Sequence, residues 1–137
     1  MLGVIALAGF LTFQFCHYDE AEEPLEYRHA TEIALAWNQL TLDLERHTLG
    51  YRPPVAARMY AYVETTAYEA SLPGLRNHIS LETYLPGYKK PGVKFEEGQF
   101  YLPASLNAAY AEILRHFFPS APADLLQQIE ILEKKHT

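Results

Sequence analysis

The spacing of the apolar side chains constrains the fold of this chain more than any other feature. Ile33, Trp37, Leu40 and Leu44 are separated by four, three and four positions, so they form one stripe along a helix. Nowhere does the sequence alternate apolar and polar residues over a useful length, as a half-buried strand would. The pattern predicts an all-α fold, with four main helices packed as a bundle or partial bundle and a long Pro/Gly loop between two of them.

Glycine and proline residues indicate where these helices begin and end. Gly50 is placed to end the first helix, and Pro53-Pro54 is placed to begin the second. Proline is tolerated in the first turn because the backbone N–H that it lacks would have no acceptor within the helix. Pro73-Gly74 is a stop for the second helix and Pro119 for the third. The predicted helices run from Leu25 to about Thr48, from about Pro54 to Ser71, from about Ala104 to Pro119, and from near Ala121 towards the end.

The second predicted helix is rich in small residues. Its small positions, together with Val63, give a thin surface that lets neighbouring helices approach closely, which predicts a central packing helix; these positions are Ala57, Ala61, Ala67 and Ala70. The same helix carries Arg58, Glu64 and Glu69. Two interpretations stay open for these charges: they lie on a helix surface or interface, or they form a buried polar network that fixes how a second domain docks.

The long region between Leu75 and Pro103 is predicted to be a loop. It contains Pro86-Gly87, Pro91-Gly92 and Gly98, and a short helix or turn at SLETYL (80–85) with Ser80 as its cap. Aromatic residues punctuate it, and aromatic residues on a polar loop often anchor it against a neighbouring surface. These residues are Tyr84, Tyr88, Phe95, Phe100 and Tyr101.

The N-terminal stretch MLGVIALAGFLTFQF is uncharged and almost wholly apolar. It is short for a membrane span, which needs about 20 residues, and suits the apolar core of a secretory signal. Cys16 followed by HYDEAEE also resembles a lipoprotein start, with the cysteine acylated and anchored in a membrane; the alternative is a buried helix with an ordinary core cysteine. We therefore expect a signal or lipoprotein-like segment at 1–16, a polar tether at 17–24, a helical N-terminal domain at 25–137, and export to the periplasm or cell envelope.

Charge and residue usage exclude several functions. The net charge is −6, with acid concentrated in DEAEEPLE (19–26), so nucleic acid is not an expected partner. None of the six histidines has a second histidine three or four positions away. Glu112 and His116 are four apart on one predicted helix, but a Glu-His pair at this spacing is a common helix-surface pattern. No Gly-x-Ser-x-Gly elbow or phosphate-binding loop occurs. We accordingly predict no catalytic, cofactor-binding or metal-ligating residue.

Several segments, in this order, carry a family resemblance: WNQLTLDLERHTLG, YRPPVAARMYAYVETTAYEA, SLPGLRNHISLE and FYLPASLNAAYAEILRHFFP. From about residue 28 onwards the chain resembles the N-terminal helical region of bacterial vanadium-dependent haloperoxidase-like proteins, within the type 2 phosphatidic acid phosphatase superfamily. The resemblance implies a helical layer packed against a catalytic helical bundle. That bundle holds vanadate or phosphate through a Lys, an Arg-Pro, a Pro-Ser-Gly-His, and a later Ser-Arg with a His, because cationic side chains and amides bind a tetrahedral anion.

This chain departs from the catalytic part of that pattern. Arg52-Pro53 has no lysine before it and is predicted to be a turn that begins a helix. The sequence Pro-Ser-Ala-Pro at 119–122 lacks the glycine and histidine of Pro-Ser-Gly-His, and no Ser-Arg pair occurs. We therefore expect a truncated or split gene product that is inactive alone and packs against a catalytic helical domain in cis or in trans. The alternative is a free-standing envelope lipoprotein or helical partner-binding module.

Overall fold

The structure is a computed structural model that describes residues 24–90 and 98–137. The predicted all-α fold is confirmed: the described residues form four α-helices and no strand. The α-helices are α1 (Leu25–His47), α2 (Pro53–Ser71), α3 (Leu102–Phe117) and α4 (Ala123–Lys135), and two short 3-10 turns, η1 (Leu72–Gly74) and η2 (Leu81–Thr83), follow α2. The predictions for residues 1–23, including the signal segment and Cys16, concern positions outside the described residues.

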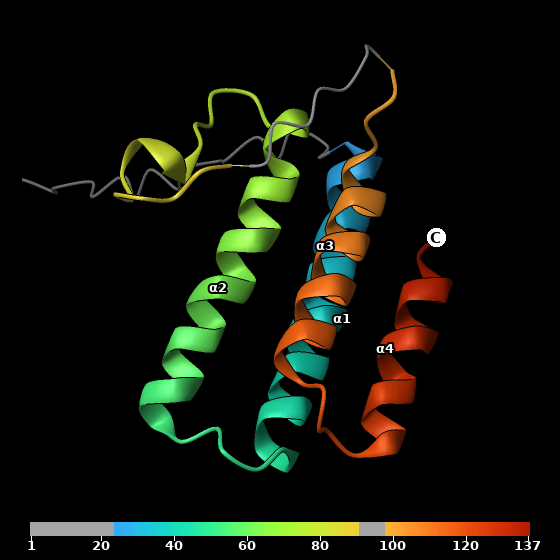
Figure 1. The fold of residues 1–137 in the computed structure, drawn as a ribbon. Helices are drawn as coiled ribbons and strands as arrows, with labels where there is room; N and C mark the ends of the chain where they lie inside the picture. The colour runs from blue at the N-terminus through green and yellow to red at the C-terminus, as the bar shows by residue number, and fades with distance from the viewer. Residues whose placement is uncertain (1–23, 91–97) are drawn as a thin grey trace, which may run out of the picture.

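The four helices run side by side, with α2 and α4 on opposite flanks and α1 and α3 between them (Figure 1). Helix α3 packs extensively against both α1 and α2 and also contacts α4, whereas α1 and α2 approach each other less closely than either approaches α3. The prediction that the second helix is the central one was therefore wrong. Helix α3 is central because it carries large apolar residues on several sides. The alanines of α2 bury little apolar area by comparison, so they contribute less to packing.

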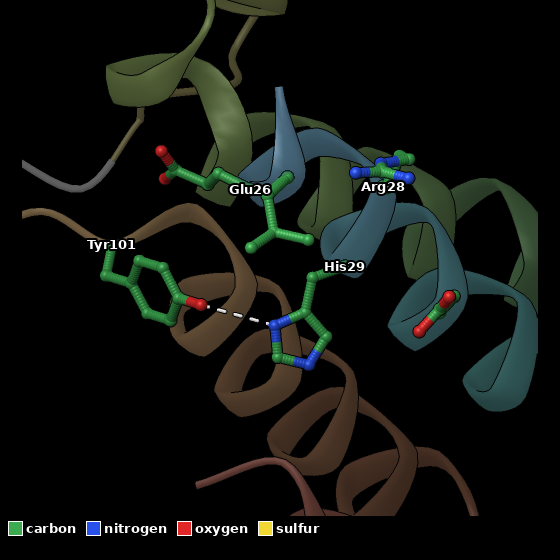
Figure 2. Close-up of a pocket in the computed structure, with 6 residues that line it drawn as sticks. Glu26, Arg28, His29 and Tyr101 are labelled. Carbon is green, nitrogen blue, oxygen red and sulfur yellow. Dashed lines mark hydrogen bonds between the residues drawn. The ribbon is translucent and has the colours of Figure 1, made fainter. Parts of the chain in front are cut away.

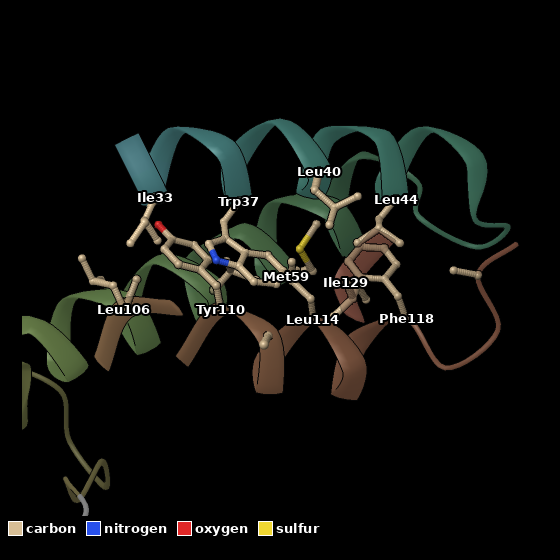
Figure 3. Close-up of a cluster of buried hydrophobic side chains, with 14 of the residues drawn as sticks. Ile33, Trp37, Leu40, Leu44, Met59, Leu106, Tyr110, Leu114, Phe118 and Ile129 are labelled. Carbon is tan, nitrogen blue, oxygen red and sulfur yellow. The ribbon is translucent and has the colours of Figure 1, made fainter. Parts of the chain in front are cut away.

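Buried side chains from all four helices form one core (Figure 3). Trp37 and Phe118 are fully buried, and Tyr51 stacks on Phe118 with ring centroids 4.5 Å apart. The predicted stripe on α1 is confirmed, since Ile33, Trp37, Leu40 and Leu44 are all buried. Helix α4 contributes Ile129 as its buried residue, with Leu125, Leu126 and Leu132 half-buried against the core. Burial of each such large side chain stabilises the fold by roughly 1.5–3 kcal/mol.

The turns between helices follow the predicted chemistry closely. Helix α1 ends at His47, where the Thr48 amide donates to the Leu44 carbonyl, and Gly50 then adopts a φ of 101°. Glycine has no steric penalty in this left-handed region. Helix α2 begins with Pro53, one residue before the predicted start, and the Arg52 carbonyl accepts the first amides of that helix. The predicted bounds are thus correct to within one or two residues here.

The segment after α2 is held to it by Glu69. One Glu69 carboxylate oxygen accepts from the Ser80 hydroxyl at 3.0 Å and from the Leu81 amide at 2.6 Å. The Ser80 hydroxyl in turn accepts from the Glu82 amide at 3.1 Å, so the predicted Ser80 cap is confirmed at the start of η2. Glu69 therefore fixes the first part of the long loop, which lies beside the end of α2 in Figure 1.

Candidate functional site

An open pocket lies beside the first turns of α1, where the chain returns into α3 (Figure 2). Its volume is about 430 Å³, and it is lined by Leu25, Glu26, Arg28, His29, Glu32 and Tyr101. Glu26 accepts from the Leu102 amide at 3.0 Å, so this carboxylate satisfies an N-terminal donor of α3. His29 Nδ1 and the Tyr101 hydroxyl lie 3.2 Å apart. The pocket therefore presents a histidine, a phenol and charges of both signs on an exposed wall.

The fold brings together two histidines that sequence spacing alone did not connect. The rings of His29 in α1 and His136 after α4 have centroids 6.0 Å apart and are tilted by 58°. Burial of the His136 ring lowers its pKa; the positive charges of Lys135 and His29 act in the same direction, and Glu32 acts against them. No group of three or more His, Cys, Asp and Glu side chains suited to a metal ion occurs among residues 24–90 and 98–137.

A line of buried hydrogen bonds crosses three helices through the core. Trp37 Nε1 in α1 donates to Asn107 Oδ1 in α3 at 2.9 Å, and Asn107 Nδ2 donates to the Glu133 carbonyl in α4 at 2.8 Å. Each of these polar groups is therefore satisfied, as buried polar groups must be to avoid a large desolvation cost. The line fixes the relative positions of α1, α3 and α4, and no sequence pattern predicts it.

A second polar group lies where α3 reaches between α1 and α2. The side chain of Tyr110 is buried and lies near Glu64 of α2 and Asn38 of α1. Burial, with the nearby Glu64 charge, raises the pKa of Tyr110 to about 12. Burial also raises the pKa of Glu64, although the hydrogen bond from Tyr110 opposes this rise. Asn38 and Glu64 thus lie near the same hydroxyl, one on each of the two helices that α3 joins.

Near Tyr110, one stripe of residues on α1 and one on α2 face outwards, away from α3. Leu35, Asn38 and Leu42 follow the i, i+3, i+7 spacing on α1, and Ala57, Ala61 and Glu64 follow the i, i+4, i+7 spacing on α2. Leu35 is 65% exposed and Leu42 is 44% exposed, and Ala57 and Ala61 are exposed as well. We call these six residues the open face. Among the described residues, no element covers it.

The open face corrects the expectation about the small residues of α2. Ala67 and Val63 are buried as predicted and Ala70 is half-buried, but Ala57 and Ala61 face solvent. No helix of this chain packs against Ala57 and Ala61, because the other helices contact a different side of α2, around Val63 and Met59. The thin surface that the sequence indicated therefore exists, but it faces outwards.

The three charges of α2 have different environments. Arg58 is exposed, Glu69 fixes the loop, and Glu64 is exposed and lies near Tyr110 of α3. The interpretation as surface charges is confirmed for Arg58 and Glu64, since both are exposed, and docking of a second domain through these charges stays a prediction. The loop aromatics also divide: Tyr84 and Tyr101 are largely exposed, Tyr88 is half-buried, and Phe100 packs against the core. Phe95 lies outside the described residues.

The segments compared above with catalytic or metal-binding motifs lie in turns or on the helix surface. Arg52 caps the start of α2, as the sequence predicted for Arg52-Pro53. The stretch 119–122 forms the turn from α3 into α4, in which the Ala121 amide donates to the Phe118 carbonyl at 3.2 Å. Glu112 and His116 lie on the outer side of α3, and both are exposed.

Comparisons of this chain with protein-family models, with curated proteins and with solved structures find no match. Over the described residues, no helix has the length and apolar character needed to cross a membrane.

Proposed function

We propose that this chain is the N-terminal structural region of an exported protein of the vanadium-dependent haloperoxidase and acid phosphatase type. It has no catalytic role by itself, and it packs against a catalytic helical bundle in the same or a separate chain. The vanadate or phosphate of that protein is bound by the catalytic bundle. The observation that carries the proposal is the open face, because an apolar and thin surface on two adjacent helices is suited to a third helix.

The residues of the open face indicate which kind of helix could dock on it. Leu35 and Leu42 supply apolar area on α1, while Ala57 and Ala61 let a helix approach α2 closely. Glu64 lies beside them with a pKa raised by burial. A lysine or arginine on the docking helix would stabilise the charged form of this carboxylate. The partner is thus a helix with a small apolar stripe and one basic residue.

The test is to determine which protein-coding sequence follows or neighbours this one and to express the helical domain that it encodes. The proposal requires a domain with a Lys, an Arg-Pro, a Pro-Ser-Gly-His and a late Ser-Arg with a His. Binding is measured by calorimetry with the wild-type chain and with Ala61→Phe, which we expect to weaken binding at least tenfold. Ala108→Phe, at an exposed alanine of α3, is the matched control and is expected to bind like wild type.

A complex that Ala61→Phe leaves unchanged would refute docking through the open face. The absence of a domain with these motifs would refute the haloperoxidase or phosphatase assignment.

A free-standing envelope lipoprotein or partner-binding module is the second candidate. The observation that favours it is the core, which draws on all four helices and encloses Trp37 and Phe118 fully. A chain of this kind would be a monodisperse monomer that melts cooperatively and binds no hydrophobic dye. Dye binding or self-association that is lost in Leu35→Glu would instead favour the structural region of a larger assembly.

A further inference from the structure

The end of α4 meets the beginning of α1 through two histidine rings. His136 lies 6.0 Å from His29, measured between ring centroids, and His29 is held in place by the Tyr101 hydroxyl at 3.2 Å. The Tyr101 hydroxyl can donate to neutral His29 or accept from the protonated form, so this contact survives a change in charge. We call the pair of His29 and His136 the histidine clasp.

The packed position of His136 favours the neutral form of its ring. Its Nε2 atom is buried, and among the described residues it has no hydrogen-bond partner. In the neutral ring, this nitrogen can carry a lone pair while Nδ1 carries the proton. Protonation would place an N–H donor and a positive charge where no acceptor is described, which costs free energy. Acidification therefore acts against the packed position of His136.

The charged groups around the clasp reinforce this bias. Lys135, adjacent in the chain, and His29, on α1, both disfavour a positive charge on His136, and Glu32 on α1 favours it. Glu26 is occupied by the Leu102 amide, and Arg28 adds a positive charge to the same end of α1. Two histidines that both take up protons would repel each other at this distance.

We propose that the histidine clasp is an acid-sensitive contact that releases the end of α4 from α1 below neutral pH. Helix α4 stays attached to α3, because Arg115 of α3 pairs with both Glu130 and Glu133, and Asn107 donates to the Glu133 carbonyl. Release is therefore a movement of the last residues of α4 away from α1. It uncovers the side of His29 that faces α4, next to the pocket of about 430 Å³.

The direction of the pH dependence follows from linkage. The pKa of His136 is lowered in the folded state, so the unfolded or released state binds the proton more readily. The clasp is thus at full strength above the ordinary histidine pKa of about 6.5 and weakens as the pH falls below that value. The range from pH 7.5 to pH 5.0 spans the ordinary histidine pKa and lies above the ordinary carboxylate pKa values of about 4.

The experiment is an NMR titration of the full chain over this range. We expect the His136 ring to titrate with a midpoint below about 6.5, and we expect the ring-to-ring contacts between His29 and His136 to disappear as it does. The His136 amide, which donates to the Glu133 carbonyl at 3.2 Å, should exchange at least tenfold faster at pH 5.0 than at pH 7.5 after correction for the intrinsic rate. Persistence of the ring contacts at pH 5.0 would overturn the proposal, as would an ordinary His136 midpoint.

Two substitutions with opposite effects separate the clasp from general acid loosening. His29→Gln should raise the titration midpoint of His136, because it removes a positive charge and part of the side chain that buries the His136 ring. Glu32→Gln should lower it, because it removes the one favourable charge; Glu32 is exposed, so the fold is unaffected. His47→Gln at the other end of α1 is the matched control and should leave the midpoint unchanged. Equal midpoints in all four proteins would show that the clasp does not exist.

Discussion

The hydrogen bond between Trp37 and Asn107 allows a quantitative test of how this bundle is held together. Trp37 is 0% exposed and Asn107 is 3% exposed, so neither group can turn to water when its partner is removed. Asn107→Leu leaves the Trp37 indole N–H buried and unpaired, which costs about 1–3 kcal/mol of the free energy of unfolding. The Glu133 carbonyl is not left unpaired, because the His136 amide and the Thr137 hydroxyl also donate to it.

Trp37→Phe leaves Asn107 Oδ1 unpaired instead and adds a loss of packing from the smaller ring. In the double variant, neither polar group of this bond remains, so the desolvation cost is not incurred twice. We therefore expect the double variant to be more stable than the sum of the single effects by about 1–2 kcal/mol.

The assay is urea unfolding followed by far-ultraviolet circular dichroism, since Trp37 is the single tryptophan and its fluorescence is lost in two of the variants. The slopes of the transitions should be equal, so that midpoints report stability. Effects that add to within about 0.5 kcal/mol would refute the reasoning, because independent residues behave in this way.

Three further predictions rest on single contacts. Gly74→Ala should lower the free energy of unfolding by about 1–3 kcal/mol in urea, because its Cβ would lie 2.7 Å from Phe100 Cε1. Glu69→Ala should release the loop, with exchange of the Leu81 amide at least tenfold faster, because a hydrogen bond to a charged group contributes about 1.5–3 kcal/mol; unchanged exchange would contradict this contact. Tyr110 has a pKa raised to about 12, so the unfolded chain loses this proton first and stability should fall between pH 10 and pH 12. Tyr110→Phe should flatten that fall in thermal unfolding, and an equally steep fall would argue against a buried phenol.

The sequence predicted the helices well because their apolar spacing and terminal residues act locally. Ile33, Trp37, Leu40 and Leu44 form a stripe regardless of what covers them, and Pro53 and Gly50 carry their own backbone preferences. The order of packing was not predictable in this way. That α3, and not α2, is central depends on contacts between residues far apart in the chain.

The site residues show the same division more strongly. His29 and His136 lie near opposite ends of the described chain, so no spacing rule pairs them. Glu64 and Asn38 meet only because Tyr110 reaches between their helices. The alanines of α2 were recognised as a thin surface, but the side on which its neighbours pack is set by the whole bundle. Haloperoxidase or phosphatase ancestry, export and acylation of Cys16 stay predictions.

The central position of α3 has a consequence for the order in which the chain can fold during synthesis. Helices α1 and α2 leave the ribosome first, yet they make few close approaches to each other and share their core chiefly through α3. Until Leu102–Phe117 has been made, Trp37 and Met59 lack the surface that buries them. The nascent chain therefore exposes its apolar stripes while the long loop is translated, and exposed apolar surface makes this the interval in which it is most prone to aggregation.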